Sequence, residues 1–217
     1  MPPLSTRKPG RPRDQALRAQ RREQILDAAG RIFAKRGFSK TDLEIVAQQI
    51  GVSKGTIYRY FRSKSALFLA AVDAGMQRLD ALIDQSIASA DDPLLGMQRA
   101  VRAYLEFFDA NPYIVELFIQ ERAFFRDRKK PTYFIYRERN HGKGHELARQ
   151  LAERGRIRNI PPQRLVTVLG ELLYGAMFTN YFAGREQSVD DQFRDIMDIV
   201  LFGILSDTER GAAPAGN

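Results

Sequence analysis

Apolar residues recur with a helical period along most of the chain. A first long helix is predicted over Arg22–Phe38, with Gly37 at its end. The residues expected on its inner face are Ile25, Ala28, Ala29, Ile32 and Phe33. Further helices are expected from after Ser63 towards Ile87, over Pro93–Asp109, Pro112–Arg126, Pro131–Arg154, Gln163–Ala183 and Val189–Leu205. Gly142 and Gly144 can interrupt the helix in which they lie. No segment alternates as a strand does, so the pattern predicts an all-α fold.

The residues from Thr41 to Phe68 predict a compact pair of short helices. Four apolar residues at i, i+3, i+4 and i+7 give the first helix one apolar stripe: Leu43, Val46, Ala47 and Ile50. Gly51 stands where a positive φ ends that helix, and Val52 can fill the corner. Ser53 is the expected N-cap of the second helix. Ile57 and Phe61 are four residues apart and should face inward.

The second of these helices leaves a polar face on the outside. Thr56, Arg59 and Tyr60 should lie on that face, with Lys54 and Gly55 at the helix N-terminus. A short helix led by small, basic and hydroxylated residues suits the DNA major groove, which admits one helix. The alternative is an ordinary helical hairpin with a solvated polar face.

The distribution of charge favours DNA. Residues 1–64 contain 15 Lys and Arg against 5 Asp and Glu, whereas the remainder contains 19 against 21. All the positive excess of the chain therefore lies in the segment with the two short helices. Such a concentration is typical of phosphate binding.

Two runs, REQILDAAGRIFAKRGF and GVSKGTIYRYF, resemble the TetR/AcrR family of bacterial transcriptional regulators. The resemblance covers about residues 20–70 and implies a helix-turn-helix DNA-binding domain, a helical body and a homodimer. It implies that Thr41 caps the second helix and that Lys64 reaches a phosphate. The DNA-binding candidates are Thr41, Ser53, Lys54, Gly55, Thr56, Tyr58, Arg59, Tyr60 and Lys64.

The resemblance also distributes roles within this set. Lys54, Gly55 and Thr56 would meet bases or the nearby backbone, and Tyr58 and Tyr60 would touch phosphates. Arg59 stands where the family varies, which makes it the candidate for a base-edge contact. Asp42 departs from the Thr or Ser usual in the family. Its acid suits a helix N-terminus but would repel DNA, so no phosphate contact is assigned to it.

The sequence divides into an arm (1–18), a helix-turn-helix domain (19–65), a ligand-binding and dimerisation body (66–207) and a tail (208–217). The arm is rich in Pro and Arg, so it is expected to be disordered, as is the tail. Its KPGRPR run resembles the core of an AT-hook, whose arginines enter a narrow minor groove. The candidates there are Arg7, Lys8, Arg11 and Arg13, and the alternative is a solvated basic tail.

Aromatic residues concentrate in the body, which holds 17 of the 22 Phe and Tyr residues. Such stripes are typical of a packed core, but Glu121 and Glu171 also fall on apolar stripes, as polar groups in a small-molecule pocket do. The pocket candidates are Phe107, Phe118, Glu121, Phe125, Tyr133, Glu171, Tyr174 and Phe178. For Glu121 the alternative is a structural ion pair with an Arg of a neighbouring helix.

The last two helices are predicted to pair with their two-fold mates in a homodimer. Val168, Leu172 and Ala176 form one stripe, and Gly175 permits close approach of a helix; Ile196, Ile199, Val200, Gly203 and Ile204 supply the other. A two-fold dimer predicts a palindromic operator with half-sites about 34–36 Å apart, or a multiple of that.

Other classes of function find little support. The chain has no Cys, no apolar signal segment and no phosphate-binding or G-x-S-x-G motif, so neither an enzyme nor a cofactor is predicted, and the cytoplasm is the expected location. His141 and His145 have metal-ligand spacing but no third ligand, so no metal site is predicted. Leu165–Ala183 is predicted to be a helix buried against protein rather than a membrane span.

The sequence therefore predicts a homodimeric repressor, released from a double-stranded DNA operator by a small hydrophobic effector. The alternative is an architectural DNA-binding protein that responds to no signal.

Overall fold

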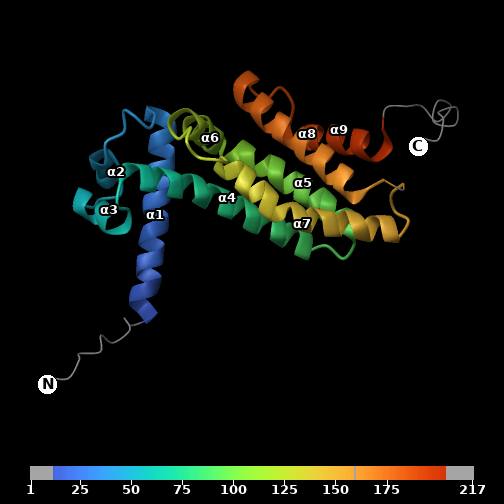
Figure 1. The fold of residues 1–217 in the computed structure, drawn as a ribbon, viewed down its shortest axis with the longest axis horizontal. Coiled ribbons are helices and arrows are strands. Elements are labelled where there is room, and N and C mark those ends of the chain that lie inside the picture. Colours follow the sequence, from blue (N-terminus) through green and yellow to red (C-terminus); the bar gives the residue numbers. More distant parts are fainter. Residues whose placement is uncertain (1–11, 159, 204–217) are drawn as a thin grey trace. The chain divides into compact units, whose positions relative to one another are not determined.

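The computed structural model describes residues 12–158 and 160–203, which form helices joined by turns and short loops (Figure 1). In these ranges the helices are α1 (Pro12–Arg36), α2 (Leu43–Gln49), α3 (Lys54–Tyr60), α4 (Lys64–Ala88), α5 (Pro93–Ala110), α6 (Pro112–Phe124), α7 (Thr132–Glu153), α8 (Pro162–Ala183) and α9 (Val189–Phe202). The described residues contain no strand, and the predicted all-α fold is confirmed.

α1 differs most from its predicted bounds. It begins at Pro12, although residues up to 18 were expected to lack structure. Proline is favoured in the first turn of a helix, because its missing N–H would have no partner there. The helix ends at Arg36, and Gly37 follows with a φ of 84° while its N–H bonds to the carbonyl of Phe33 at 2.8 Å. The expected glycine stop is confirmed.

The chain forms two compact units. The first contains residues up to Gln77 together with Glu116–Phe134, and the second contains Arg78–Val115 and the residues from Ile135 onward. The unit that holds the helix-turn-helix therefore also takes in the second half of α6 and the loop before α7. Both of these were predicted to belong to the body.

The core of the first unit is apolar and fully closed to solvent around α1. Ile25, Phe33, Ile57, Leu67 and Phe68 are 0% exposed. Five phenylalanine rings continue this core towards the end of α6, with ring centroids of neighbouring pairs 5.1–6.0 Å apart: Phe33, Phe38, Phe68, Phe124 and Phe125. Aromatic pairs at this separation stabilise beyond their buried area. These contacts bind the end of α6 to α1, to the loop after α1 and to α4.

A buried carboxylate fixes the loop between α6 and α7. Glu121 is 1% exposed and its Oε1 accepts from the Arg128 guanidinium at 2.6 Å. The same oxygen accepts from the Thr132 hydroxyl at 2.8 Å and the Thr132 N–H at 3.0 Å. Since Thr132 is the first residue of α7, Glu121 also satisfies a backbone donor that a helix N-terminus leaves open. Of the two predicted roles for Glu121, the ion pair is the one present.

In the second unit α5 packs against α8 and α9 (Figure 1). Tyr104, Leu105 and Phe108 of α5 are buried. Asn180 of α8 and Gln192 of α9 exchange two amide hydrogen bonds of 2.9 and 3.0 Å. These bonds leave the donors and acceptors of the two amide groups paired with each other.

α7 is one continuous helix, so the interruption considered at Gly142 and Gly144 is absent. A Cβ at Gly144 would lie 3.2 Å from Cγ1 of Val166, which belongs to α8. Gly144 therefore allows α7 and α8 to approach closely rather than breaking the helix.

Among the described helices, none has a stretch both long and apolar enough to cross a bilayer, and this includes Leu165–Ala183 of α8.

Arg128→Met should lower the free energy of unfolding. Breaking a buried pair by removing one partner costs about 3–5 kcal/mol, and because Arg128 is partly exposed and Thr132 still donates, we expect about 2–3 kcal/mol. Urea unfolding followed by circular dichroism measures this. Arg126→Met makes the same change of charge at an exposed neighbour and should have an effect within about 0.5 kcal/mol. Equal effects of the two substitutions would contradict the structural role of Arg128.

Candidate nucleic-acid interface

α3 is a seven-residue helix whose orientation depends on two buried side chains. Ile57 is 0% exposed and Phe61, at its C-cap, is 5% exposed, so both face inward as predicted. At the other end Ser53 is the N-cap, and its Oγ accepts from the N–H of Thr56 at 3.2 Å. An isolated helix this short is unstable in water, so these contacts are what hold α3 in place.

The turn before α3 has the predicted geometry. Gly51 has a φ of 67°, a conformation that costs glycine little and other residues more. The N–H of Val52 then bonds to the carbonyl of Ala47 in α2 at 2.9 Å. These features set the direction in which α3 leaves α2.

With Ile57 and Phe61 inward, the opposite face of α3 is open to solvent. Gly55, Tyr58 and Arg59 are exposed, and Tyr58 keeps 48% of its surface accessible. Lys54, Thr56 and Tyr60 are half-buried. Phenolic, hydroxyl and guanidinium groups are those that bind phosphates and base edges.

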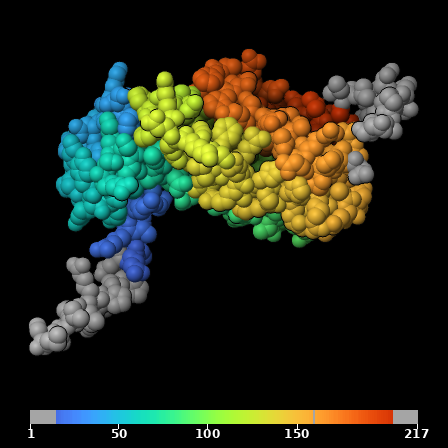
Figure 2. Space-filling model, in the orientation of Figure 1, coloured from blue at the N-terminus to red at the C-terminus, as the bar shows by residue number. Residues whose placement is uncertain are grey.

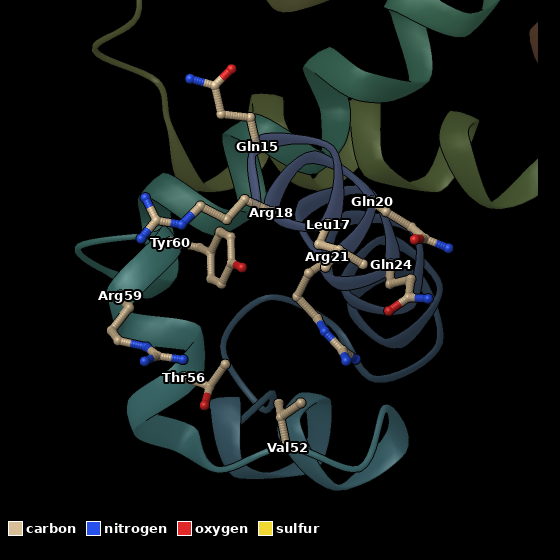
Figure 3. Close-up of a pocket in the computed structure, with 10 residues that line it drawn as sticks. All are labelled: Gln15, Leu17, Arg18, Gln20, Arg21, Gln24, Val52, Thr56, Arg59 and Tyr60. Carbon is tan, nitrogen blue, oxygen red and sulfur yellow. The ribbon is translucent and has the colours of Figure 1, made fainter. Parts of the chain in front are cut away.

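The open face of α3 borders a pocket of about 850 Å³ in the first unit (Figure 3). Thr56, Arg59 and Tyr60 line it from α3, and Val52 lines it from the turn. The other walls come from α1: Gln15, Leu17, Arg18, Gln20, Arg21 and Gln24. These α1 residues were not among the predicted site residues, because the apolar stripe that predicted the helix begins only at Ile25.

The sequence of this region matches a known family of proteins. The sequence profile of bacterial regulatory proteins of the tetR family matches residues 25–71, which contain α2, α3 and most of the core around them. The match assigns residues 25–71 to the tetR family. The resemblance inferred from the sequence is thus confirmed.

Curated relatives match this chain over part of its length. An HTH-type transcriptional repressor of Mycobacterium tuberculosis is 37% identical over 91 residues, which are 42% of this chain and 46% of the relative. The HTH-type transcriptional activator FasR of Mycolicibacterium smegmatis is 32% identical over 92 residues, 42% of each chain. The chain thus spans less than half the length of the curated relatives it matches.

The likeness to solved structures extends over most of the chain. The fatty acid degradation regulator FadR from Bacillus halodurans superimposes with a TM-score of 0.72 at 16% identity, covering 91% of this chain and 98% of that one. At this level of identity the likeness establishes the fold of the chain and nothing about its ligand.

One residue that the TetR resemblance implicated has a role other than the one it implied. Thr41 does not cap α2. Its hydroxyl donates to the carbonyl of Gly37 at 2.8 Å, and the residue is 2% exposed. The cap is Asp42, whose Oδ1 accepts from the N–H of Glu44 at 2.9 Å. The assignment of the cap to Thr41 was wrong, because the loop turns Thr41 back towards the end of α1 and brings Asp42 to the helix.

Asp42 also bonds to a DNA-binding candidate. Its Oδ1 lies 2.8 Å from Nζ of Lys54, the first residue of α3. The Glu44 N–H and Lys54 together hold the pKa of Asp42 below its ordinary value, and the bond to Asp42 raises the pKa of Lys54. Both groups are therefore charged at neutral pH, and the carboxylate offsets the positive charge of Lys54.

Lys64 was expected to reach a phosphate. Its ammonium donates to the carbonyls of Ser39 and Thr41, at 3.2 and 3.0 Å, and the phosphate contact stays a prediction. It also lies 4.9 Å from the centre of the Phe38 ring. In this structure Lys64 thus closes the loop between α1 and α2.

The remaining candidates fall into separate groups. Arg7, Lys8 and Arg11 lie outside the described residues, as does the side chain of Arg13 and the tail 208–217. Among the pocket candidates, Phe118, Glu121, Phe125 and Tyr133 belong to the first unit, and Phe107, Glu171, Tyr174 and Phe178 to the second.

The pocket candidates also differ in the contacts that they make. Phe125 belongs to the five-ring cluster, and the rings of Phe118 and Tyr133 are 5.6 Å apart. Tyr174 and Phe178 lie 4.9 Å apart. Glu171 was expected among apolar side chains, but its side chain is 64% exposed, 3.9 Å from Arg137.

Lys64→Met should destabilise the DNA-binding unit. Methionine keeps an apolar stem over Phe38 but leaves two carbonyls without their donor, which we expect to lower the free energy of unfolding by about 1–2 kcal/mol. Urea unfolding measures the loss, and Lys40→Met, an exposed lysine of the same loop, is the control. Unchanged stability together with weaker DNA binding would instead support the phosphate contact.

Proposed function

We propose that this protein is a homodimeric transcriptional repressor that binds a palindromic DNA operator and is released from it by a small hydrophobic effector. The observation that carries the proposal is the orientation of α3 inside the matched TetR segment. Ile57 and Phe61 are buried, while Tyr58 and Arg59 are open to solvent. The proposed activity is regulatory binding and not catalysis.

DNA is the partner whose chemistry suits the open face of α3. The proposed contacts are Lys54, Gly55 and Thr56 near the bases, with Tyr58 and Tyr60 on phosphates. Arg59 is the proposed reader of a base edge, because guanidinium bonds two acceptors of a guanine at once. Ser53 orients the helix as its cap.

Exposed apolar residues on the last two helices support the proposed dimer. Val168 and Phe182 of α8, with Ile199 and Phe202 of α9, are all exposed in the single chain. At Gly175 a Cβ would meet nothing within 4 Å, so a helix of a second copy has room to approach. A four-helix interface of these two helices with their mates would remove this apolar surface from water.

An apolar effector suits the aromatic residues of the second unit. Phe107 and Phe108 of α5 are buried with rings 5.2 Å apart, and burial raises the pKa of Tyr174. The structural neighbour FadR is described as a regulator of fatty acid degradation. We therefore propose that the effector is hydrophobic, without assigning its identity.

Selection of duplexes from a random pool by the purified protein tests the proposed function. A palindromic sequence should be enriched, with half-sites about 34–36 Å apart or a multiple of that. Arg59→Ala should relax the preference at one base pair of each half-site, worth about 1–3 kcal/mol. Arg62→Ala makes the same change of charge just beyond α3 and should keep the preference. Equal binding of selected and random duplexes would indicate an architectural protein instead.

Asp42→Ser should strengthen binding to all duplexes alike. Serine can still cap α2, but the carboxylate beside Lys54 is gone. Since the exposed carboxylate repels nearby phosphates, we expect binding to tighten a few-fold at low salt, and by less at high salt. Affinities for selected and random duplexes over a range of salt measure this. Asp27→Ser, which removes an exposed acid on α1, is the control, and a gain confined to the selected duplex would contradict the electrostatic explanation.

A further inference from the structure

The first half of α1 makes almost no packing contact within its unit. Every residue from Gln15 to Gln24 is exposed, and Leu17 keeps 57% of its surface accessible. In the space-filling view these residues project from the atoms of α2 and α3 (Figure 2). Most of the stability of a helix in a protein comes from packing one face. This half of α1 has no such face inside the unit.

One side of this exposed segment nevertheless forms a defined surface. Leu17, Gln20, Arg21 and Gln24 follow the i, i+3, i+4, i+7 spacing of a single helix face, and Arg18 borders them. All five line the pocket whose other wall is α3. Figure 3 shows Arg18 and Arg21 extending from α1 towards the side formed by α3 and its preceding turn. The segment therefore faces the recognition helix.

The chemistry of the pocket is that of a phosphate-binding surface. Of its ten lining residues, three are arginines, three are glutamines and two carry hydroxyl groups, and none is acidic. Arginine, glutamine, threonine and tyrosine side chains supply most contacts to the sugar-phosphate backbone of DNA. A surface of donors without an opposing carboxylate favours a polyanion over a cation or an apolar ligand.

We infer that the first half of α1 is a second DNA-contacting element, which holds a sugar-phosphate strand between Arg18 and Arg21 on one side and Tyr60 and Arg59 on the other. The inference rests on the proposed function, since the strand belongs to the duplex that α3 reads. It extends the footprint of each subunit beyond α3. It also gives a partner to a helical segment whose residues from Gln15 to Gln24 are all exposed within their own unit.

DNA is favoured over a small anion because the pocket and the open face of α3 share residues. Thr56, Arg59 and Tyr60 line the pocket and also belong to the open face of α3. A DNA strand that contacts these three residues would therefore also pass along α1 while it remains part of the duplex. A free phosphate would use only a small part of a space of about 850 Å³.

The test is the double substitution Arg18→Ala/Arg21→Ala. It should weaken binding to the selected duplex and to random duplexes alike and leave the base preference unchanged. Each lost phosphate contact lowers the slope of log K against log salt by about 0.9, so two contacts should lower it by about 1.8 for each bound subunit. Hydroxyl-radical footprinting should show lost protection of the backbone flanking the bases read by α3.

Arg31→Ala is the matched control, because Arg31 lies on the same helix, outside the pocket, in an exposed pair with Asp27. It should keep the wild-type salt slope and footprint, and circular dichroism should show the same helix content for all variants. An unchanged slope and footprint in the double variant would overturn the inference while the proposed function stands. An equal loss in Arg31→Ala would reduce the effect to net charge and overturn it too.

Competition with inorganic phosphate completes the test. If phosphate at matched ionic strength displaces the wild-type protein from DNA no better than chloride does, the strand remains the occupant. Strong displacement that the double variant lacks would make the pocket a small-anion site and contradict the inference. Failure of the wild-type protein to prefer any duplex would instead refute the proposed function.

Discussion

The candidate interface depends on the burial of Ile57 and Phe61. α3 has only seven residues and cannot persist by itself, so its direction is fixed by these two side chains and by the Ser53 cap. Because they are four residues apart, burying them leaves Tyr58 and Arg59 on the opposite side. The chemistry offered to solvent is thus a consequence of core packing, and a change that loosens the core would redirect the whole polar face.

The positive charge of the first unit is less available than the composition suggests. Lys54 is paired with Asp42, and Lys64 donates to two loop carbonyls. Arg59, Arg18 and Arg21 instead border one pocket without an acidic residue among its lining. The geometry therefore divides the cations into those that hold the loops together and those turned towards a common space, a division that net charge alone does not reveal.

The sequence predicted elements well where one local rule decides. The Gly51 turn, the Ser53 cap and the inward pair on α3 each depend on residues within one or two helical turns. Prediction failed for the cap of α2, where Asp42 takes the place of Thr41 because the Thr41 hydroxyl reaches back to Gly37. The bonds of Lys64 were not predicted, because they join its ammonium to carbonyls 23 and 25 residues earlier in the chain. The exposed first half of α1 was not predicted to belong to a site, because it buries no face and its sequence therefore has no apolar stripe.

The unit boundaries bear on how the proposed effector would act on α3. α4, α6 and α7 each have residues in both units, so three continuous helices join them. The part of α6 inside the first unit is held firmly, by the five phenylalanine rings, by Gln120 donating to the Phe33 carbonyl at 3.0 Å, and by Glu121. Packed cores respond to displacement by switching arrangement rather than by stretching. A ligand that favours a different position of α6 would therefore change the packing of Phe33 and Phe38. These rings pack in the unit whose core also buries Ile57.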